Sequence, residues 1–395
     1  MNVLFLTHRL PYAPNRGDRI RAYYLMREMS RFASVRLFSL VHDDDEESQA
    51  GAVPFAKSVT TARVRRGRGL WRGVTNLLTG RPLTHALLDA PGCGAALADL
   101  VRASAPDVIV SFCSGMARFA LAAPLDQFPL VLDLVDVDSA KWAAMAGTNR
   151  GARRWVYGRE ARTLGAFEAA AAARARATLV VNAREAEALK ALAPSANVRI
   201  IENGVDVESF QPPSAPADAS VTIFCGVLSY QPNEDGVRWF AADVWPRIRA
   251  AVPSAQFLIV GSGATATIRT LAARDSSIQL VGAVDRVQPH LWRAAVSVAP
   301  LLVARGLQNK VLEALAAGLP VVITPAVDAG LPDEARQGCT VASDPTAFAD
   351  AVATLLTISA DARRARARRA DLARLTWADR LAPLEGILRE AAIPA

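Results

Sequence analysis

The chain has 395 residues, of which 51% are hydrophobic and 21% charged, and its formal net charge is +7. This length allows two or three domains with a large buried core, and the absence of any run of about 20 uncharged apolar residues excludes a membrane-spanning helix. The first residues lack the charged-then-apolar order of a signal peptide. We therefore expect a cytoplasmic protein whose positive charge favours anionic partners.

Short apolar runs alternate with helical patterns through the first half of the chain. The expected strands are Asn2–Leu6, Val35–Val41, Asp107–Ser111, Leu130–Leu134, Thr178–Asn182 and Val198–Glu202. The expected helices are Ile20–Arg31, Gly94–Ser104, Arg153–Arg174 and Arg184–Leu192. This alternation is typical of a parallel sheet covered by helices.

A basic segment, residues 57–82, lies within this first half. It carries Lys57, Arg63, Arg65, Arg66, Arg68, Arg72 and Arg81 and no acidic residue. The spacing of Trp71, Val74, Leu77 and Leu78 predicts a basic amphipathic helix, which fits an anionic membrane surface. The alternative is a helix packed on its own domain with its arginines in solvent. Nucleic acid is not expected, because no nucleic-acid-binding motif accompanies the charge.

Residues 211–219 form the most proline-rich and least periodic stretch, and we interpret them as an interdomain linker. A second alternating series follows. Its expected strands are Val221–Cys225, Gln256–Val260, Ser277–Val281, Val296–Leu301 and Pro320–Thr324. Its expected helices are 237–250, 265–273, 286–294 and 306–317, with a helical tail over 345–358, 360–375 and 377–391. Two doubly wound halves predict ligand binding at the carboxyl ends of the strands.

The most informative stretch is 303–315, Val-Ala-Arg-Gly-Leu-Gln-Asn-Lys-Val-Leu-Glu-Ala-Leu, which follows an apolar strand and opens a helix. The first turn of a helix has unpaired N–H groups and partial positive charge. Arg305, Asn309 and Lys310 add side chains that suit an anion. Glu313 lies one turn beyond Lys310 on the same helix face. A cation for phosphate and a carboxylate for neighbouring hydroxyls indicate a nucleotide or nucleotide-sugar site.

The four cysteines, Cys93, Cys113, Cys225 and Cys339, are scattered without the spacing of a metal site. Three of them fall in or beside apolar strands or small-residue stretches. We interpret them as reduced packing residues. We expect neither a bound metal nor a separate cofactor.

Several fragments, in a fixed order, cover almost the whole chain. They are the glycine-bearing loop 10–21, the Asn-Gly-Val-Asp turn 203–206, the loop 226–233, Val-Gly-Ser-Gly at 260–263, the turn 281–284 and the helix with its exit at 309–322. Each is weak alone, but together they resemble the retaining family 4 of the GT-B glycosyltransferases. The block 132–142, Glu160, Glu168 and the helix start 305–310 resemble bacterial exopolysaccharide sugar transferases of the PEP-CTERM/exosortase-associated type.

The resemblance implies an α/β GT-B fold with two Rossmann-like doubly wound domains facing a cleft. Residues 1–208 would be the acceptor-side domain, 209–375 the nucleotide-sugar donor domain, and 376–395 a helix crossing back onto the N-terminal domain. The implied reaction moves a sugar, with retention, from a nucleoside diphosphate sugar to a hydroxyl of a glycan or polyprenyl-linked acceptor. Residues 57–82 would hold the enzyme at the inner membrane face.

The resemblance also implies roles for individual residues. Glu313 would bind the ribose hydroxyls, and Lys310 would neutralise charge on the diphosphate leaving group. The alternatives are a surface glutamate and a lysine that only pairs with it. The remaining implied donor-site residues are Gly17, Gly226, Asn233, Gly282, Gly306 and Asn309. Of these, Gly17 and Gly226 would let the backbone approach the donor, unless they are ordinary turn glycines.

Two departures from the family pattern concern charge. Arg305 stands near the position where the family keeps the first of two glutamates, so either Arg305 contacts the sugar or diphosphate or the sugar is oriented differently. The loop after Gly226 lacks the Arg and Lys of many relatives and has Tyr230, Gln231 and Asn233 instead. Arg305 and Lys310 would then supply the missing charge.

Asp136 stands near the position where relatives place an acceptor-side catalytic residue, often a histidine. It would accept a hydrogen bond from the attacking hydroxyl. Asp136 and Asp138 also form an Asp-x-Asp pair, which coordinates a divalent cation in the other main glycosyltransferase fold. That fold has one nucleotide-binding sheet and this chain has two, so we assign the pair to the acceptor side. His8 ends the first strand and is the histidine best placed to line the cleft.

Three other functions have to be weighed against glycosyl transfer. A GT-B epimerase would convert the sugar nucleotide without an acceptor, which product analysis with donor alone would reveal. A dinucleotide-dependent oxidoreductase is disfavoured, because neither first strand leads into Gly-x-Gly-x-x-Gly. A non-catalytic sugar-nucleotide-binding scaffold is compatible with the Arg305 departure. Loss of donor turnover in a Glu313→Ala variant would count against the scaffold.

Overall fold

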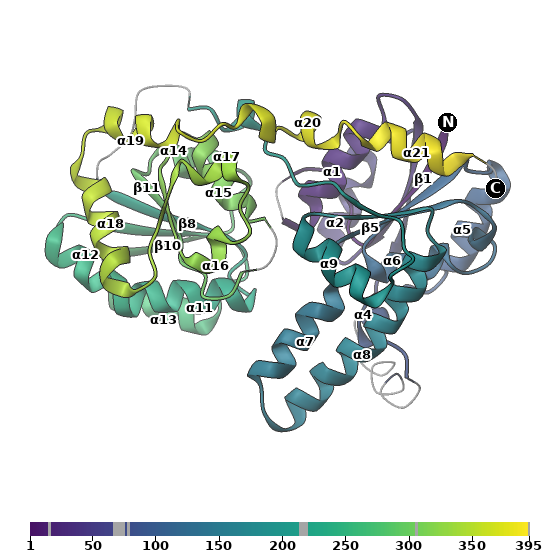
Figure 1. Cartoon of the computed structure of the whole chain (residues 1–395), viewed down its shortest axis with the longest axis horizontal. Helices are drawn as coiled ribbons and strands as arrows, with labels where there is room; N and C mark the ends of the chain where they lie inside the picture. Colours follow the sequence, from purple (N-terminus) through teal and green to yellow (C-terminus); the bar gives the residue numbers. More distant parts are fainter. Residues whose placement is uncertain (15–16, 66–75, 77–79, 213–219, 305–306, 394–395) are drawn as a thin grey trace. The chain divides into compact units, whose positions relative to one another are not determined.

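The computed structural model describes residues 1–14, 17–65, 76, 80–212, 220–304 and 307–393. The chain forms two compact units. Unit 1 comprises Met1–Glu202 and Leu381–Ala395, and unit 2 comprises Asn203–Arg380 (Figure 1). The domain borders expected at residues 208 and 376 remain predictions, whereas the observed division falls after Glu202 and after Arg380.

Unit 1 contains a seven-stranded parallel sheet in the order β3-β2-β1-β4-β5-β6-β7. Its strands are β1 (Asn2–Thr7), β2 (Ser34–Val41), β3 (Ser58–Arg63), β4 (Val108–Phe112), β5 (Leu130–Val135), β6 (Ala177–Val180) and β7 (Val198–Ile200). The central strands β1 and β4 are buried along nearly their whole length, as a sheet covered on both faces requires. The strand order reverses between β1 and β4, which creates a topological switch point.

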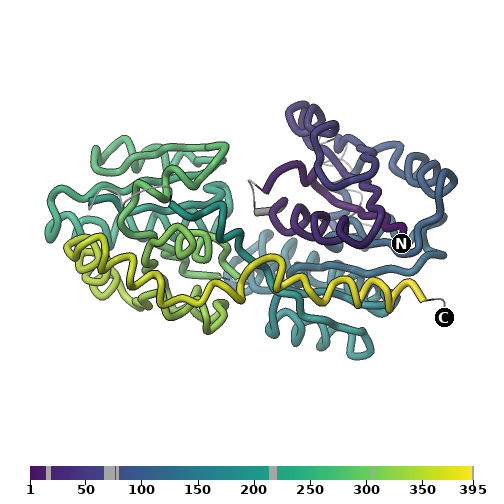
Figure 2. Tube along the Cα trace, turned by 90° about the horizontal axis from the view of Figure 1, so that it is seen from above, coloured from purple at the N-terminus to yellow at the C-terminus, as the bar shows by residue number. Residues whose placement is uncertain are grey.

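Helices cover this sheet. They are α1 (Gly17–Met29), α2 (Asp44–Ser48), η1 (Gln49–Ala52), α4 (Leu83–Leu87), α5 (Cys93–Ala103), α6 (Ser114–Ala120), η2 (Leu125–Gln127), α7 (Asp138–Thr148), α8 (Gly151–Arg174), α9 (Ala183–Leu192) and α21 (Leu384–Ala392). The C-terminal helix α21 packs on α1, β4 and β5 through buried Leu384 and Leu388 (Figure 2). The expected return of the C-terminal helix to the N-terminal domain is therefore confirmed.

Helices α7 and α8 form a hairpin that extends beyond the sheet of unit 1 (Figure 1). Its base is fixed by Glu168 of α8, whose carboxylate accepts hydrogen bonds from the backbone N–H of Asp138 at 3.1 Å and of Ser139 at 3.3 Å. Free N–H groups at a helix start need such acceptors. Burial raises the pKa of the Glu168 carboxyl to about 7, although the bonds from Ser139 oppose the shift. The hairpin is thus anchored at its base by a buried side chain.

Unit 2 contains a six-stranded parallel sheet in the order β10-β9-β8-β11-β12-β13, with its switch point between β8 and β11. Its strands are β8 (Val221–Cys225), β9 (Gln256–Val260), β10 (Ile278–Gly282), β11 (Val296–Ala299), β12 (Val321–Ile323) and β13 (Cys339–Val341). The surrounding helices are α10 (Val207–Phe210), α11 (Gln231–Trp239), the π-helical η3 (Phe240–Val244), α12 (Trp245–Ala251), α13 (Ala266–Arg274), α14 (Gln288–Trp292), α15 (Asn309–Ala316), α16 (Pro325–Asp328), α17 (Asp333–Arg336), α18 (Pro345–Thr357), α19 (Ala360–Ala367), η4 (Ala373–Leu375) and α20 (Trp377–Leu381).

The expected α/β architecture with two doubly wound sheets is confirmed, and every expected strand forms. Some local predictions were wrong. The basic segment 57–82 begins with β3, a strand that was not predicted. The helix expected from 237 begins at Gln231, and the helix expected from Gly306 begins at Asn309. The amphipathic pattern at 71–78 and most of the linker 211–219 lie outside the described residues. In the described part of the chain no helix has the length and apolar character to cross a membrane.

Candidate functional site

The turns that leave the central strands of unit 2 lie against one another at the carboxyl edge of the sheet. Gly226 follows β8, and its N–H donates to the Val260 carbonyl at 3.0 Å. Gly261 follows β9, and its N–H donates to the Gly282 carbonyl at 2.8 Å. A Cβ on Gly261 would lie 1.8 Å from the Gly226 carbonyl oxygen, and its φ of +151° is rare for other residues. Only glycine therefore allows this backbone approach.

Lys310 of α15 and Asn233 of α11 meet across the switch point. The Lys310 Nζ donates a hydrogen bond to Asn233 Oδ1 at 2.6 Å and lies 4.7 Å from the centroid of the Phe224 ring. Asn233 is only 5% exposed, and its Nδ2 donates to the Val227 carbonyl at 2.8 Å. That second bond orients the amide so that its oxygen faces the ammonium. A Cβ on Gly226 would lie 3.1 Å from Nζ, so glycine leaves room for the cation.

Glu313 lies one turn beyond Lys310 on α15. Its carboxylate makes no ion pair or side-chain hydrogen bond with the residues that the structure describes. Burial raises the pKa of Glu313 to about 7, although Lys310 opposes the shift. Burial also lowers the pKa of Lys310 to about 8, against the opposing influence of Cys225 and Glu313. Two ionisable groups with pKa values displaced toward neutrality at a sheet edge are typical of a functional site.

Other predicted residues of this unit lie at the same sheet edge. Asn309 is the first residue of α15, and its Oδ1 is 3.5 Å from Asn203 Nδ2. Gly282 ends β10 with a φ of +83°, and a Cβ there would meet no atom within 4 Å. Because α15 begins at Asn309, the N–H groups of its first turn belong to residues from Asn309 onward rather than from Gly306. Arg305 and Gly306 themselves lie outside the described residues.

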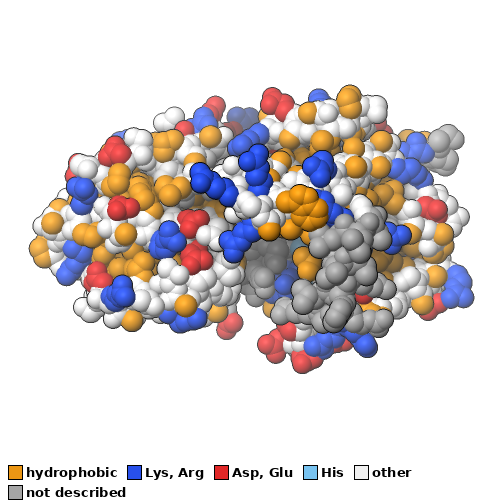
Figure 3. Space-filling model, turned by 90° about the horizontal axis from the view of Figure 1, so that it is seen from below, with side chains coloured by type: hydrophobic (Ala, Val, Ile, Leu, Met, Phe, Trp, Pro, Cys, Tyr) orange, Lys and Arg blue, Asp and Glu red, His pale blue; other side chains and the backbone are white. Residues whose placement is uncertain are grey.

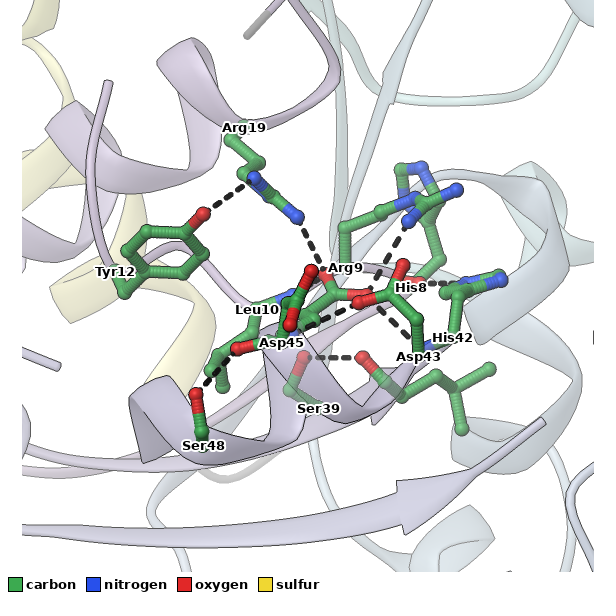
Figure 4. A network of polar contacts seen from close by, with 12 residues as sticks. His8, Arg9, Leu10, Tyr12, Arg19, Ser39, His42, Asp43, Asp45 and Ser48 are labelled. Atoms are coloured by element: carbon green, nitrogen blue, oxygen red, sulfur yellow. Dashed lines mark hydrogen bonds and ion pairs between the residues drawn. The ribbon is translucent and has the colours of Figure 1, made fainter. Parts of the chain in front are cut away.

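In unit 1 the loop after β1 is held by a buried carboxylate that no sequence motif revealed. Glu46 of α2 accepts backbone hydrogen bonds from Leu10 at 3.0 Å and His42 at 2.9 Å. It also pairs with Arg9 at 3.2 Å and Arg19 at 3.1 Å, and Figure 4 shows the polar contacts around this loop. Hydrogen bonds to charged groups are among the stronger ones. The loop that leads to α1, which begins at Gly17, is therefore firmly fixed near its start.

Asp136 lies in the turn after β5, where the backbone is strained. The preceding Val135 has a φ of +67°, which is unfavourable for a β-branched residue, and its N–H donates to Asp133 Oδ1 at 3.0 Å. Lys141 contacts Asp136 at 2.9 Å and Asp138 at 3.1 Å. Burial lowers the pKa of Lys141, but the two carboxylates outweigh it and the net shift is upward. The Lys141 ammonium thus lies within ion-pair distance of both carboxylates.

His8 directly follows β1 and lies beside Cys113, which follows β4. Its Nδ1 lies 3.5 Å from the Cys113 Sγ, and its ring stacks on Phe112 with centroids 5.7 Å apart. Burial raises the pKa of the Cys113 thiol to about 12, which makes that thiol a poor nucleophile. The imidazole and Asp136 both belong to the carboxyl edge of the unit 1 sheet.

Comparison with protein families matches residues 219–357 to a family described as "Glycosyl transferases group 1". Comparison with curated proteins finds no match. Several solved structures share the fold over nearly the whole chain. Sucrose-phosphate synthase from Thermosynechococcus elongatus is 16% identical, with a TM-score of 0.70 and 99% of this chain and 98% of that chain covered. Anabaena HepE in complex with UDP is 15% identical, with a TM-score of 0.67 and coverages of 98% and 100%. WaaG, a glycosyltransferase involved in lipopolysaccharide biosynthesis, is 16% identical, with a TM-score of 0.65 and 98% of both chains covered.

Two doubly wound parallel sheets, and full-length likeness to these structures, define the GT-B fold. The family match over most of unit 2 indicates that the protein is a glycosyltransferase. Within unit 2, residues 219–357 are similar to the glycosyl transferases of group 1.

Proposed function

We propose that this chain transfers a glycosyl group, with retention of configuration, from a nucleoside diphosphate sugar to a hydroxyl of a lipid-linked glycan precursor in exopolysaccharide synthesis. The observation that supports it most directly is the cluster of Lys310, Asn233 and Glu313 at the switch point of the unit 2 sheet. Ligands of open α/β sheets bind at such points. HepE, which has the same fold, is described in complex with UDP and with UDP-glucose, and this favours a uridine nucleotide as the first candidate.

In this proposal Lys310 contacts the diphosphate and Glu313 the ribose. Charge develops on the diphosphate as the glycosidic bond breaks, and a fixed ammonium lowers the free energy of that state. A carboxylate with open acceptor positions suits a pair of vicinal hydroxyls. Gly226, Gly282 and Asn309 would contribute backbone and amide contacts, and Arg305 and Gly306 would complete the site.

On the acceptor side we propose that Asp136 accepts a hydrogen bond from the attacking hydroxyl. Asp136 follows β5 at the carboxyl edge of the unit 1 sheet, beside a strained Val135. Its ion pair with Lys141 at 2.9 Å orients the carboxylate. Gly17, which begins α1 at the same edge, would approach the donor by its backbone. Residues 57–82 would bring the enzyme to the anionic membrane surface where lipid-linked acceptors lie.

A thermal-shift panel of UDP-, GDP-, ADP- and TDP-sugars tests the donor assignment, because ligand binding to the folded state raises apparent stability. One nucleotide series should raise the unfolding temperature of the wild type and not that of Glu313→Ala. The matched control is Glu187→Ala, which removes an exposed glutamate of unit 1 and should leave the shift intact. No response to any nucleotide sugar by folded protein would refute the donor site.

Product analysis tests the reaction itself. Incubation with the identified donor and no acceptor separates transfer from epimerisation, since an epimerase would yield a new sugar nucleotide. Binding without turnover, in the presence of lipid-linked acceptors, would instead favour a scaffold.

A further inference from the structure

The end of the α7–α8 hairpin carries charge and exposed apolar surface that the proposed reaction does not use. We name this surface the hairpin tip and define it as residues 145–155. Every residue there is exposed except Ala146 and Asn149, which are partly exposed. Trp155 is 58% exposed and Met145 is 38% exposed. Large apolar side chains that are exposed together with cationic ones at the end of a projecting element offer a surface to a partner.

The charge of the hairpin tip has one sign. Arg150, Arg153 and Arg154 belong to it, and no acidic residue occurs from Ser139 to Arg159. None of the three arginines forms an ion pair with the described part of the chain. Surface arginines of globular domains are usually mixed with acidic residues, and an unbalanced group produces a local positive potential. The positive electrostatic potential of the hairpin tip therefore favours binding of an anionic partner.

Side-chain packing between α7 and α8 holds the two helices of the hairpin together. Trp142 of α7 and Tyr157 of α8 pack with ring centroids 5.3 Å apart. Gly165 allows close contact, since a Cβ there would lie 3.4 Å from Ser139. Figure 3, which views the side on which the hairpin projects, shows Lys and Arg side chains bordering hydrophobic ones.

We propose that the hairpin tip docks on an anionic lipid bilayer, with Trp155 and Met145 entering the headgroup region and the three arginines binding lipid phosphates. Tryptophan is enriched at membrane–water interfaces because its ring has both apolar and hydrogen-bonding parts. Arginines beside buried apolar residues add electrostatic attraction to anionic lipids. A nucleic acid or an acidic protein would also attract arginine, but the interleaved Trp and Met favour a surface with an apolar interior. This contact lies outside residues 57–82 and does not depend on the donor chemistry.

Docking would place the acceptor-side turn at a defined height. Helix α7 has 11 residues and begins directly after the Asp136 turn. At 1.5 Å per residue it spans about 16 Å. The turn after β5 would therefore lie about the length of α7 away from the lipid headgroups. A glycan whose lipid end stays in the bilayer could reach it there.

The test is co-sedimentation of the full chain with phosphatidylcholine vesicles that do or do not contain phosphatidylglycerol. Wild type should bind only the anionic vesicles, and more weakly as salt is raised. An R153E/R154E variant should bind at least about 25-fold more weakly, because each arginine near an anionic surface contributes roughly a fivefold gain in partition. The matched control R368E/R369E makes the same charge change at adjacent exposed arginines of unit 2 and should retain most of the binding.

A second readout reports insertion of the indole. Vesicles with brominated acyl chains should quench the tryptophan fluorescence of wild type more than that of Trp155→Phe, and Trp155→Ala should lower vesicle binding. The proposal is overturned if wild type ignores anionic vesicles, if R153E/R154E binds as well as the control, or if both variants lose binding equally. Binding of the tip to heparin without binding to vesicles would also overturn it. Donor turnover with a water-soluble acceptor is measured in parallel and should be the same in R153E/R154E, so failure of the membrane contact is separable from failure of the proposed reaction.

Discussion

The Lys310 ammonium donates a hydrogen bond to Asn233 Oδ1 at 2.6 Å, and this bond joins the first turns of α15 and α11 across 77 positions of sequence. The amide cannot easily turn away, because its Nδ2 is bonded to the Val227 carbonyl. The cation is therefore already placed beside the Gly226 turn before a ligand binds. Such preorganisation reduces the free-energy cost of ordering the site.

We predict that Asn233→Ala weakens binding of the cognate nucleoside diphosphate by about 10- to 100-fold. Hydrogen bonds to charged groups contribute about 1.5–3 kcal/mol, and the variant leaves Lys310 without its acceptor. Titration calorimetry measures the affinity. The control is Gln231→Ala in the same helix, because the Gln231 amide donates to partly exposed Asp235 and not to Lys310, so the nucleotide affinity of this variant should not change. Wild-type affinity in Asn233→Ala would contradict the positioning role.

We predict that nucleotide affinity has a maximum between about pH 7 and pH 8. The pKa of Lys310 is lowered to about 8, so the ammonium is present below that pH and lost as pH rises through it. The pKa of Glu313 is raised to about 7, so its carboxylate is present above that pH and lost as pH falls through it. Affinity measured across pH 6 to 9.5 should fall on both sides, the range being chosen to span roughly one unit beyond each pKa.

The variant Lys310→Arg identifies the alkaline limb. A guanidinium keeps its charge throughout this range, so the fall in affinity near pH 8 should disappear even if the absolute affinity is lower. The acid limb should stay in place, since Glu313 is unchanged. An alkaline limb that persists in Lys310→Arg would show that another group titrates there.

We predict that Gly261→Ala destabilises unit 2 by about 3 kcal/mol or more, because a Cβ would collide with the Gly226 carbonyl and the φ of +151° is strained for alanine. Urea unfolding followed by circular dichroism measures the free energy. The control is Gly386→Ala in α21, where a Cβ meets no atom within 4 Å. That change should stabilise the helix by up to about 1 kcal/mol. Equal stability of Gly261→Ala and wild type would refute the close backbone approach.

We predict that Asp133→Asn destabilises unit 1 by about 3–5 kcal/mol, because it leaves the buried Arg21 guanidinium without its counter-charge. The two groups are 2.8 Å apart, and their side chains are 0% and 2% exposed. Asp133 also accepts the Val135 N–H, so the variant should loosen the turn that carries Asp136. Asp126→Asn, at an exposed position, should change stability by no more than about 0.5 kcal/mol. Similar unfolding curves for both variants would contradict the prediction.

The architecture could be predicted because parallel strands buried on both faces leave continuous apolar runs, as in β1 and β8. Edge strands leave a weaker signal. Strand β3 is at most partly buried along its length. Its Ser, Thr and Arg residues give no continuous apolar run, so the sequence of this basic segment does not indicate a strand. Helix α7 was also missed, because its alanines and single glycine give little helical periodicity next to the Asp136 turn. Proline at the start of α11 is compatible with a first helical turn, although the family resemblance places this stretch in a loop.

The site could be predicted only in part. Sequence spacing places Lys310 and Glu313 on one helix face, but it cannot show which residue from another helix meets the lysine. The sequence predicts that Asn233 contacts the ligand, which stays a prediction, and the structure adds a hydrogen bond from Lys310 to its amide oxygen that no local pattern indicates. The pairing of Glu46 with the β1 loop depends on tertiary packing across tens of residues, which no local pattern records.

The packing of α21 on α1, β4 and β5 makes unit 1 discontinuous in sequence, whereas unit 2 is one continuous segment. Chain synthesis delivers residues in order, and domains generally fold as units. The apolar surface that receives Leu384 and Leu388 must therefore wait until the whole of unit 2 has been made. The unit whose strands are synthesised first is the last to be completed, and throughout that interval it exposes apolar surface that favours aggregation.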